Sequence, residues 1–212
     1  MAIELKSPEE IEIMREAGRI VAQVLRMLVA AIRPGVVERD LDDIVRREYK
    51  ARGAIPTFLG YHGYPATVCV SINDEIVHGI PGDRVIREGD IVSLDLGATY
   101  RGFVGDSAIT VGAGDVSEEK GRLIRVTEKC LWEGIEAARP GARMGDVSWA
   151  IQEHAEQNGF SVVREYVGHG IGRKLHDDPP VPNYLPPDDN PRLRRGMVLA
   201  IEPMVNMGKP EV

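Results

Sequence analysis

The chain contains an internal duplication, in which the same succession of helix boundaries occurs twice, about 106 residues apart. Ser7-Pro8-Glu9-Glu10 is typical of a helix start, because serine caps the first turn and proline is tolerated at the first helical position. Arg33-Pro34-Gly35 is typical of a helix end, and Ser117-Glu118-Glu119 and Arg139-Pro140-Gly141 repeat both signals in the second half. The chain is therefore predicted to fold as two similar halves.

Each half continues with a shorter helix and then with β-type sequence. The shorter helices are expected near 40–53 and 146–159, and the β-type segments at 66–72 and 160–167. We predict an α+β fold in which each half combines two helices with an antiparallel sheet. An approximate two-fold axis would relate the halves, with the helices outside a curved sheet. We expect one catalytic domain over 1–212, with pseudo-repeats over about 7–110 and 117–212.

Two apolar segments, at matching positions of the halves, each contain an acid near their end. Gly89-Asp90-Ile91-Val92-Ser93-Leu94-Asp95-Leu96 and Gly196-Met197-Val198-Leu199-Ala200-Ile201-Glu202-Pro203 place Asp95 and Glu202 107 residues apart. At the same offset His62 corresponds to His169. An acid directed inward from an apolar segment is costly to desolvate unless a cation or a partner offsets the cost. This pattern suggests a metal site.

Asp106 follows Asp95 by eleven residues, with Arg101-Gly102 between them. A hairpin that turns near Arg101-Gly102 would bring the two carboxylates together. Taken alone, Asp106 is more typical of a turn and His169 of a loop. Taken together with Asp95 and Glu202 in a duplicated frame, they indicate metal ligands. Oxygen donors with one imidazole suit Mn, Fe, Co or Zn, and two such ions roughly 3.5–4 Å apart would activate water and polarise a carbonyl.

Composition restricts the partners and the compartment. A net charge of −7 argues against broad affinity for nucleic acid or for an anionic membrane. Cys69 and Cys130 lie far apart without zinc-type spacing, so a disulfide framework is not indicated. Residues 1–6 lack the apolar stretch of a signal peptide, and no segment approaches the length of a membrane span. A cytoplasmic protein is therefore expected.

These residues lie in motifs that resemble the type I methionine aminopeptidases, which have the pita-bread (creatinase/aminopeptidase) fold. The resemblance covers the whole chain in order, and its motifs are long and specific. Besides Asp95 with Asp106, they are Gly60-Tyr61-His62-Gly63-Tyr64-Pro65, Asn73-Asp74-Glu75-Ile76-Val77-His78-Gly79-Ile80-Pro81, Tyr166-Val167-Gly168-His169-Gly170-Ile171-Gly172, His176-Asp177-Asp178-Pro179 and Ile201-Glu202-Pro203-Met204-Val205-Asn206.

The resemblance implies a metal-dependent aminopeptidase that removes the initiator methionine from nascent chains, the reaction of N-terminal methionine excision. It implies two divalent ions (Co, Mn, Fe or Zn), whose ligands would be Asp95, Asp106, His169 and Glu202. Glu202 would also shuttle the proton of the attacking water. His78 and His176 would contact the nitrogen and the carbonyl oxygen of the scissile peptide.

The resemblance also implies how the substrate is bound. The methionine side chain would enter an apolar, polarizable pocket. The substrate-binding residues would be Phe58, Tyr61, His62, Tyr64, Cys69, His78 and His176. The implied partners are nascent polypeptides that begin with Met and the ribosome, although no local signature indicates ribosome contact. Neither direct reading of nucleic acid nor membrane association is implied, and a monomer is expected.

Two other functions on the same fold stay open: a peptidase that acts on Xaa-Pro bonds, and a non-catalytic binding protein. Retention of the acids and histidines named above speaks against the binding protein. The duplication further predicts a counterpart of Asp106 beyond Val212, so the final strands of the fold are expected to be absent. These 212 residues alone are therefore expected to bind metal weakly and to have little activity.

Overall fold

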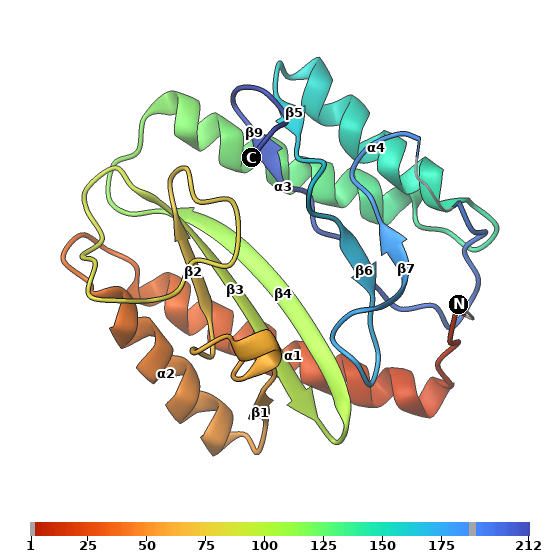
Figure 1. Ribbon diagram of the computed structural model, residues 1–212, viewed down its shortest axis with the longest axis horizontal. Coiled ribbons are helices and arrows are strands. Elements are labelled where there is room, and N and C mark those ends of the chain that lie inside the picture. The colour runs from red at the N-terminus through yellow and green to blue at the C-terminus, as the bar shows by residue number, and fades with distance from the viewer. Residues whose placement is uncertain (1–2, 187–189) are drawn as a thin grey trace. The chain divides into compact units, whose positions relative to one another are not determined.

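Two hydrophobic cores, one for each half of the chain, organise the computed structural model, which describes residues 3–186 and 190–212 (Figure 1). The N-terminal unit comprises Glu9–Lys120 and Gly172–Leu175. The C-terminal unit comprises the described parts of Met1–Pro8, Gly121–Ile171 and His176–Val212. None of the described helices is long and apolar enough to span a bilayer.

The N-terminal unit packs two helices against a four-stranded antiparallel sheet. Its elements are α1 (Pro8–Ala31), α2 (Glu38–Ala51), β1 (Ile55–Pro56), the 3₁₀ turn η1 (Tyr61–Gly63), β2 (Cys69–Ile72), β3 (Ile91–Tyr100) and β4 (Phe103–Gly112). Strand β3 pairs with β4 over its whole length, and with β2 and β1 on its other side. Helices α1 and α2 lie together against this sheet (Figure 1).

Helical and strand periodicity in the sequence account for the core of this unit. Apolar residues recur along α1 at helical spacing, so one face of the helix is buried, including Val21, Val24 and Leu28. In β3, Leu94 and Leu96 alternate with Asp95 and are fully buried in the same cluster. The alternation therefore directs Asp95 to the face of the sheet that α1 and α2 do not cover.

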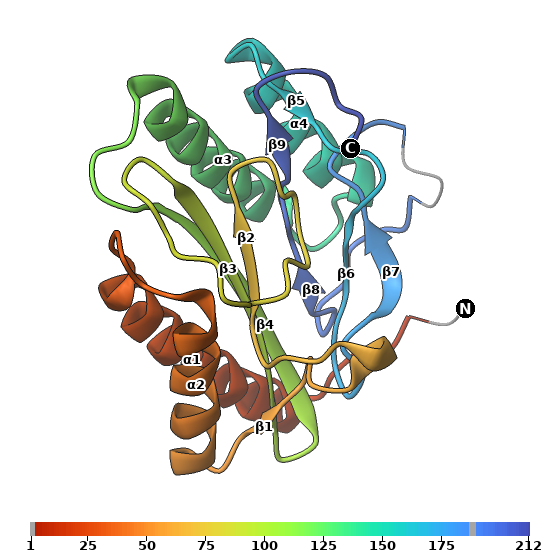
Figure 2. The same ribbon diagram turned by 60° about the vertical axis from the view of Figure 1, so that its left-hand side comes forward.

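The C-terminal unit also contains two long helices, followed by shorter strands. Its elements are α3 (Glu118–Ala137, whose first turn belongs to the other unit), α4 (Met144–Gln157), β5 (Ser161–Val162), β6 (Gly168–Gly170), β7 (Asp177–Val181), β8 (Leu199–Ala200) and β9 (Val205–Asn206). Strand β6 lies between β7 and β8, and β5 pairs with β9, all antiparallel (Figure 2). The core of this unit is built from α3, α4 and apolar strand residues, among them Val126, Ile151 and Val162.

The predicted duplication is confirmed within each unit by equivalent backbone contacts. An isolated bridge joins Val37 to Val85 in the first half, and another joins Arg143 to Arg192 at the same relative positions in the second. Next to these bridges, the Gly35 amide donates to the Ile86 carbonyl at 2.8 Å, and the Gly141 amide donates to the Leu193 carbonyl at 2.8 Å. The predicted helix boundaries and the hairpin turn at Arg101-Gly102 are also confirmed.

Two of the predictions made from the sequence are wrong. His62 is not the structural counterpart of His169, because His62 lies in η1 whereas His169 lies in β6 opposite Ala200. The equivalent register position in the first half, opposite Ser93, belongs to Ser71. The predicted strand over 160–167 is reduced to Ser161–Val162, because only these two residues pair with β9 within the described part of the chain.

Candidate metal centre

The β3–β4 hairpin places the two aspartates on one face of its sheet. Asp95 and Gly97 share a face because they are two positions apart, and Asp106 lies directly opposite Gly97 on β4. Asp95 and Asp106 are therefore diagonal neighbours, within reach of one another across the strands. Cys69 on β2 lies directly opposite Asp95 and adds a thiol to the same face.

Three of the predicted pocket residues surround this acidic face. The Phe58 ring lies against Gly97, where a Cβ atom would come within 2.7 Å of the ring. The Tyr64 hydroxyl lies 2.8 Å from the Gly79 carbonyl oxygen and 3.0 Å from that of Val68, and it is a hydrogen-bonding neighbour of the Cys69 thiol. The structure therefore brings Phe58, Tyr64 and Cys69 together with the predicted ligands of this unit.

The environment keeps the two titratable groups of this pocket neutral. Burial and, to a smaller extent, the nearby Asp95 carboxylate together raise the pKa of the Cys69 thiol to about 12. Burial likewise raises the pKa of the Tyr64 hydroxyl above its ordinary value. The Cys69 thiol and the Tyr64 phenol are therefore both uncharged at neutral pH.

The other predicted residues of this unit lie on more exposed segments. Tyr61 and His62 form η1, and their rings contact edge to face, with centroids 4.4 Å apart. His78 is exposed and lies in the long connection between β2 and β3, with a left-handed backbone (φ 62°). All three residues are therefore placed by turns and connections, whereas the two aspartates are placed by strand register.

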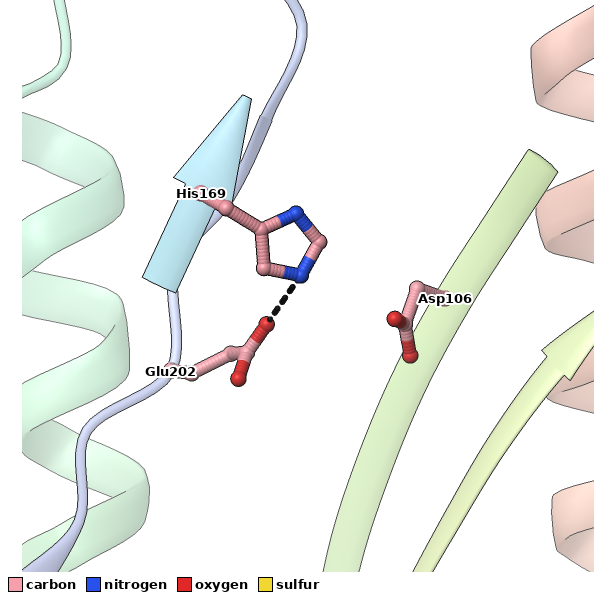
Figure 3. Close-up of side chains that lie close together, drawn as sticks. All are labelled: Asp106, His169 and Glu202. Carbon is pink, nitrogen blue, oxygen red and sulfur yellow. Dashed lines mark ion pairs between the residues drawn. The ribbon is translucent and has the colours of Figure 1, made fainter. Parts of the chain in front are cut away.

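In the C-terminal unit, His169 and Glu202 form a close pair. His169 is 7% exposed on β6, and its Nε2 lies 3.0 Å from Glu202 Oε1 just beyond β8 (Figure 3). The other ring nitrogen, Nδ1, lies 2.9 Å from the Gly170 carbonyl oxygen. Because a carbonyl can only accept, Nδ1 carries a proton.

This geometry fits a metal ligand. With the proton on Nδ1, a neutral imidazole presents the lone pair of Nε2 to a carboxylate that also offers only lone pairs. Two such acceptors 3.0 Å apart repel unless a proton or a cation lies between them. A histidine whose Nδ1–H is held by a backbone carbonyl is the arrangement found in metal-ligating histidines. The donor set of one imidazole with carboxylates suits divalent Mn, Fe, Co or Zn.

Two further residues adjoin this pair, one predicted and one missed. The ring of His176, a predicted catalytic residue, contacts the ring of His169 edge to face, with centroids 4.3 Å apart. Asn183, which no sequence signal singled out, is fully buried, and its Nδ2 donates to the Glu202 main-chain carbonyl at 2.8 Å. Asn183 therefore fixes the backbone from which the Glu202 side chain extends.

Comparison with known proteins identifies the family. Residues 12–211 match metallopeptidase family M24. The chain is 53% identical over 203 residues to methionine aminopeptidase 1 of Bacillus subtilis, a match that covers 96% of this chain and 82% of the relative.

Solved structures give the fold. The crystal structure of methionine aminopeptidase from Thermotoga maritima matches with a TM-score of 0.95 at 48% identity, covering 98% of this chain and 84% of that one. The prolidase of Pyrococcus furiosus matches with a TM-score of 0.81 at 28% identity, covering 94% of this chain and 57% of that one. The expected α+β pita-bread fold is thereby confirmed. The chain therefore belongs to metallopeptidase family M24 and, within it, to the methionine aminopeptidases.

Proposed function

We propose that this chain hydrolyses the peptide bond after an N-terminal methionine, with nascent polypeptides that begin with Met as its substrates. The observation that carries the proposal is the pair of His169 and Glu202, whose facing acceptor atoms need a proton or a cation between them. Family membership supports the same reaction, because the relatives at about half identity are methionine aminopeptidases.

We propose that two divalent ions (Mn, Fe, Co or Zn) are held by Asp95, Asp106, His169 and Glu202. Such ions would supply Lewis acidity, lowering the pKa of a water and polarising the substrate carbonyl. The hairpin register supports the two aspartates as ligands, because it directs both to one face of β3 and β4. The number and the identity of the ions are part of the proposal.

The chain's own residues would move the proton and orient the peptide. The Glu202 carboxylate would take a proton from the attacking water and deliver it to the departing amine. His176, beside the His169 ring, and His78, on the β2–β3 connection, would donate to or accept from the scissile peptide and stabilise the charge that develops on it. Each of these roles needs direct contact with the substrate.

The pocket beside Asp95 would receive the methionine side chain. Phe58, Tyr64 and Cys69 would form its wall, and Tyr61 and His62 of η1 would complete the binding region. A thioether is polarizable and makes favourable contacts with sulfur and aromatic rings. Because the Cys69 thiol and the Tyr64 hydroxyl stay protonated, the wall would not favour a charged first residue. Ribosome contact and a monomeric state stay predictions.

The test is release of methionine from Met-Ala-Ser by the 212-residue chain with added Mn(II) or Co(II), compared with a chelator-treated sample and with an Ala-Pro substrate. Weak metal-dependent cleavage of Met-Ala-Ser, with no cleavage of Ala-Pro, is expected, and preference for Ala-Pro would favour an Xaa-Pro peptidase instead. His169→Ala should lower metal affinity in calorimetric titration independently of turnover. Unchanged metal affinity in this variant would overturn the assignment of His169 as a ligand.

A further inference from the structure

The connection that carries His78 has a strained backbone at that residue. His78 has φ 62°, in the left-handed region that few residues other than glycine adopt at low cost. Such a conformation persists only where the surrounding structure determines it. Contacts on both sides of His78 must therefore hold the connection between β2 and β3 in place.

The residue after His78 is fixed by two hydrogen bonds to β2 and a third to Tyr64. The Gly79 carbonyl accepts from the Val70 amide at 2.9 Å and from the Tyr64 hydroxyl at 2.8 Å. The Gly79 amide donates to Ser71 Oγ at 3.1 Å. A Cβ atom at position 79 would collide with the Val70 carbonyl, so only glycine permits this close approach.

Before His78, the connection is held by Glu75 and Arg84. The Glu75 carboxylate accepts from the Ile72 amide at 2.8 Å. It also accepts two bonds from the Arg84 guanidinium, at 3.0 and 2.6 Å. Arg84 lies beyond His78 in the chain, so this bidentate pair closes the connection into a loop. The Arg84 guanidinium also holds the pKa of Glu75 below its ordinary value.

After His78, the loop is tied to the start of α2 by Glu38, which is 2% exposed. Its Oε1 accepts from Arg84 Nε at 2.6 Å, and its Oε2 accepts from the Gly82 amide at 3.0 Å. The backbones are joined as well, since Glu38 N donates to the Arg84 carbonyl and Arg39 N donates to the Gly82 carbonyl. A buried carboxylate that lost these partners would be left uncompensated, so the contacts are hard to give up.

We propose that Glu38, Arg84 and Glu75 are positioning residues that hold the His78 side chain in the geometry required for catalysis. The inference rests on the proposed role of His78 and assigns to these three residues a part that acts through it. Glu38 holds the segment after the strained residue through its bonds from Gly82 and Arg84, and Arg84 joins that segment to Glu75 on the other side. We call Glu38, Arg84 and Glu75 the clamp. Loosening the clamp would allow the backbone at His78 to move, whereas the pairing of β3 with β4, which places the two aspartates, would stay intact.

A double-mutant cycle between the clamp and His78 tests this inference. The variants are Glu38→Gln, which keeps the volume of the side chain, Arg84→Met, and each of these combined with His78→Ala. Glu48→Gln is the matched control, since Glu48 forms its own ion pair with Arg52 near the other end of α2. Steady-state hydrolysis of Met-Ala-Ser gives kcat and KM, and circular dichroism identifies the variants that are folded.

A positioning role predicts that Glu38→Gln and Arg84→Met lower kcat about tenfold, with less than about a twofold change in KM. In the His78→Ala background the same substitutions should change kcat by less than about twofold, because residues acting as a unit are not additive. Equal effects in both backgrounds, or full activity in folded clamp variants, would overturn the inference.

Two further readouts separate this inference from the proposed function. If His78→Ala retains full activity, the role of His78 is wrong and the positioning role fails with it. If the unaltered chain does not release methionine, amide hydrogen exchange over 76–81 still tests the clamp. Glu38→Gln should then accelerate exchange in this segment at least about tenfold relative to Glu48→Gln, in the range of local opening. Equal exchange in the two variants would overturn the clamp.

Discussion

The close approach of α1 to β4 gives the sharpest test of the N-terminal unit. A Cβ atom added at Gly105 would lie 2.6 Å from the Gly18 amide nitrogen and 2.7 Å from the carbonyl carbon of Ala17. Both atoms belong to the helix backbone, so no side chain can rotate away. Gly105→Ala should therefore push α1 and β4 apart, and Asp106, the next residue, should shift with the strand.

The expected cost follows from these distances. Contacts under 3.0 Å to backbone require movement, and overpacking of this kind costs about 1–3 kcal/mol or more. For a chain of this length, each kcal/mol lowers Tm by about 2–4 °C, so Gly105→Ala should lower Tm by about 2–12 °C. Gly18→Ala is the matched control, since a Cβ there meets no atom within 4 Å. It should raise stability by about 0.5–1 kcal/mol, as expected for glycine to alanine within a helix.

The assay is thermal and urea unfolding followed by circular dichroism, with calorimetric titration of Mn(II) as a second measurement. Gly105→Ala should lower both the unfolding midpoint and the metal affinity, because its strand carries Asp106. An unfolding midpoint equal to that of the unaltered chain would refute the reasoning, since it would mean that the helix and the strand are not in rigid backbone contact.

Two other predictions concern the C-terminal unit. Asn183→Leu leaves the Glu202 carbonyl oxygen without its donor, and should lower the free energy of unfolding in urea by about 1–3 kcal/mol; an unchanged midpoint would contradict this. Burial raises the pKa of Cys130 from 9.0 to about 12, so the native state keeps a proton that the unfolded chain loses. The stability from this proton is present below pH 9 and is lost as the pH rises toward 12. Between these limits the free energy of unfolding in urea should fall by about 1.4 kcal/mol per pH unit more for the unaltered chain than for Cys130→Ala. The same pH dependence in both proteins would contradict this prediction.

Local patterns in the sequence were sufficient for much of the fold. The helix boundaries at Pro8 and Glu118 follow serine and acidic signals, and the β3–β4 hairpin follows an alternating apolar segment with a turn at Arg101-Gly102. The duplication added long-range information, because it matched positions that no local pattern connects. For the same reason the amino-acid sequence alone was enough to choose Asp95 and Glu202 as candidate ligands.

The contacts that the sequence did not reveal are those between residues far apart in the chain with no repeated pattern. Glu38 and Arg84 are 46 residues apart, and Asn183 and Glu202 are 19 apart. Strand assignment beyond Val162 failed because pairing with β9, and not the β-type composition of the segment, determines where a strand ends. Backbone strain at His78 likewise arises from tertiary contacts and leaves no local sequence signature.

The hydroxyl of Tyr64 has a consequence for any attempt to redesign this protein. Its oxygen lies within hydrogen-bond distance of the Val68 carbonyl and of the Gly79 carbonyl and neighbours the Cys69 thiol, and its ring belongs to the proposed methionine pocket. Tyr64 thus connects the proposed pocket, which would select the first residue of the substrate, to the loop that carries His78. Replacing Tyr64 with a smaller residue to admit a bulkier substrate side chain would also remove the hydrogen bond to Gly79, the neighbour of His78. A substitution that changes selectivity at this position should therefore change turnover as well.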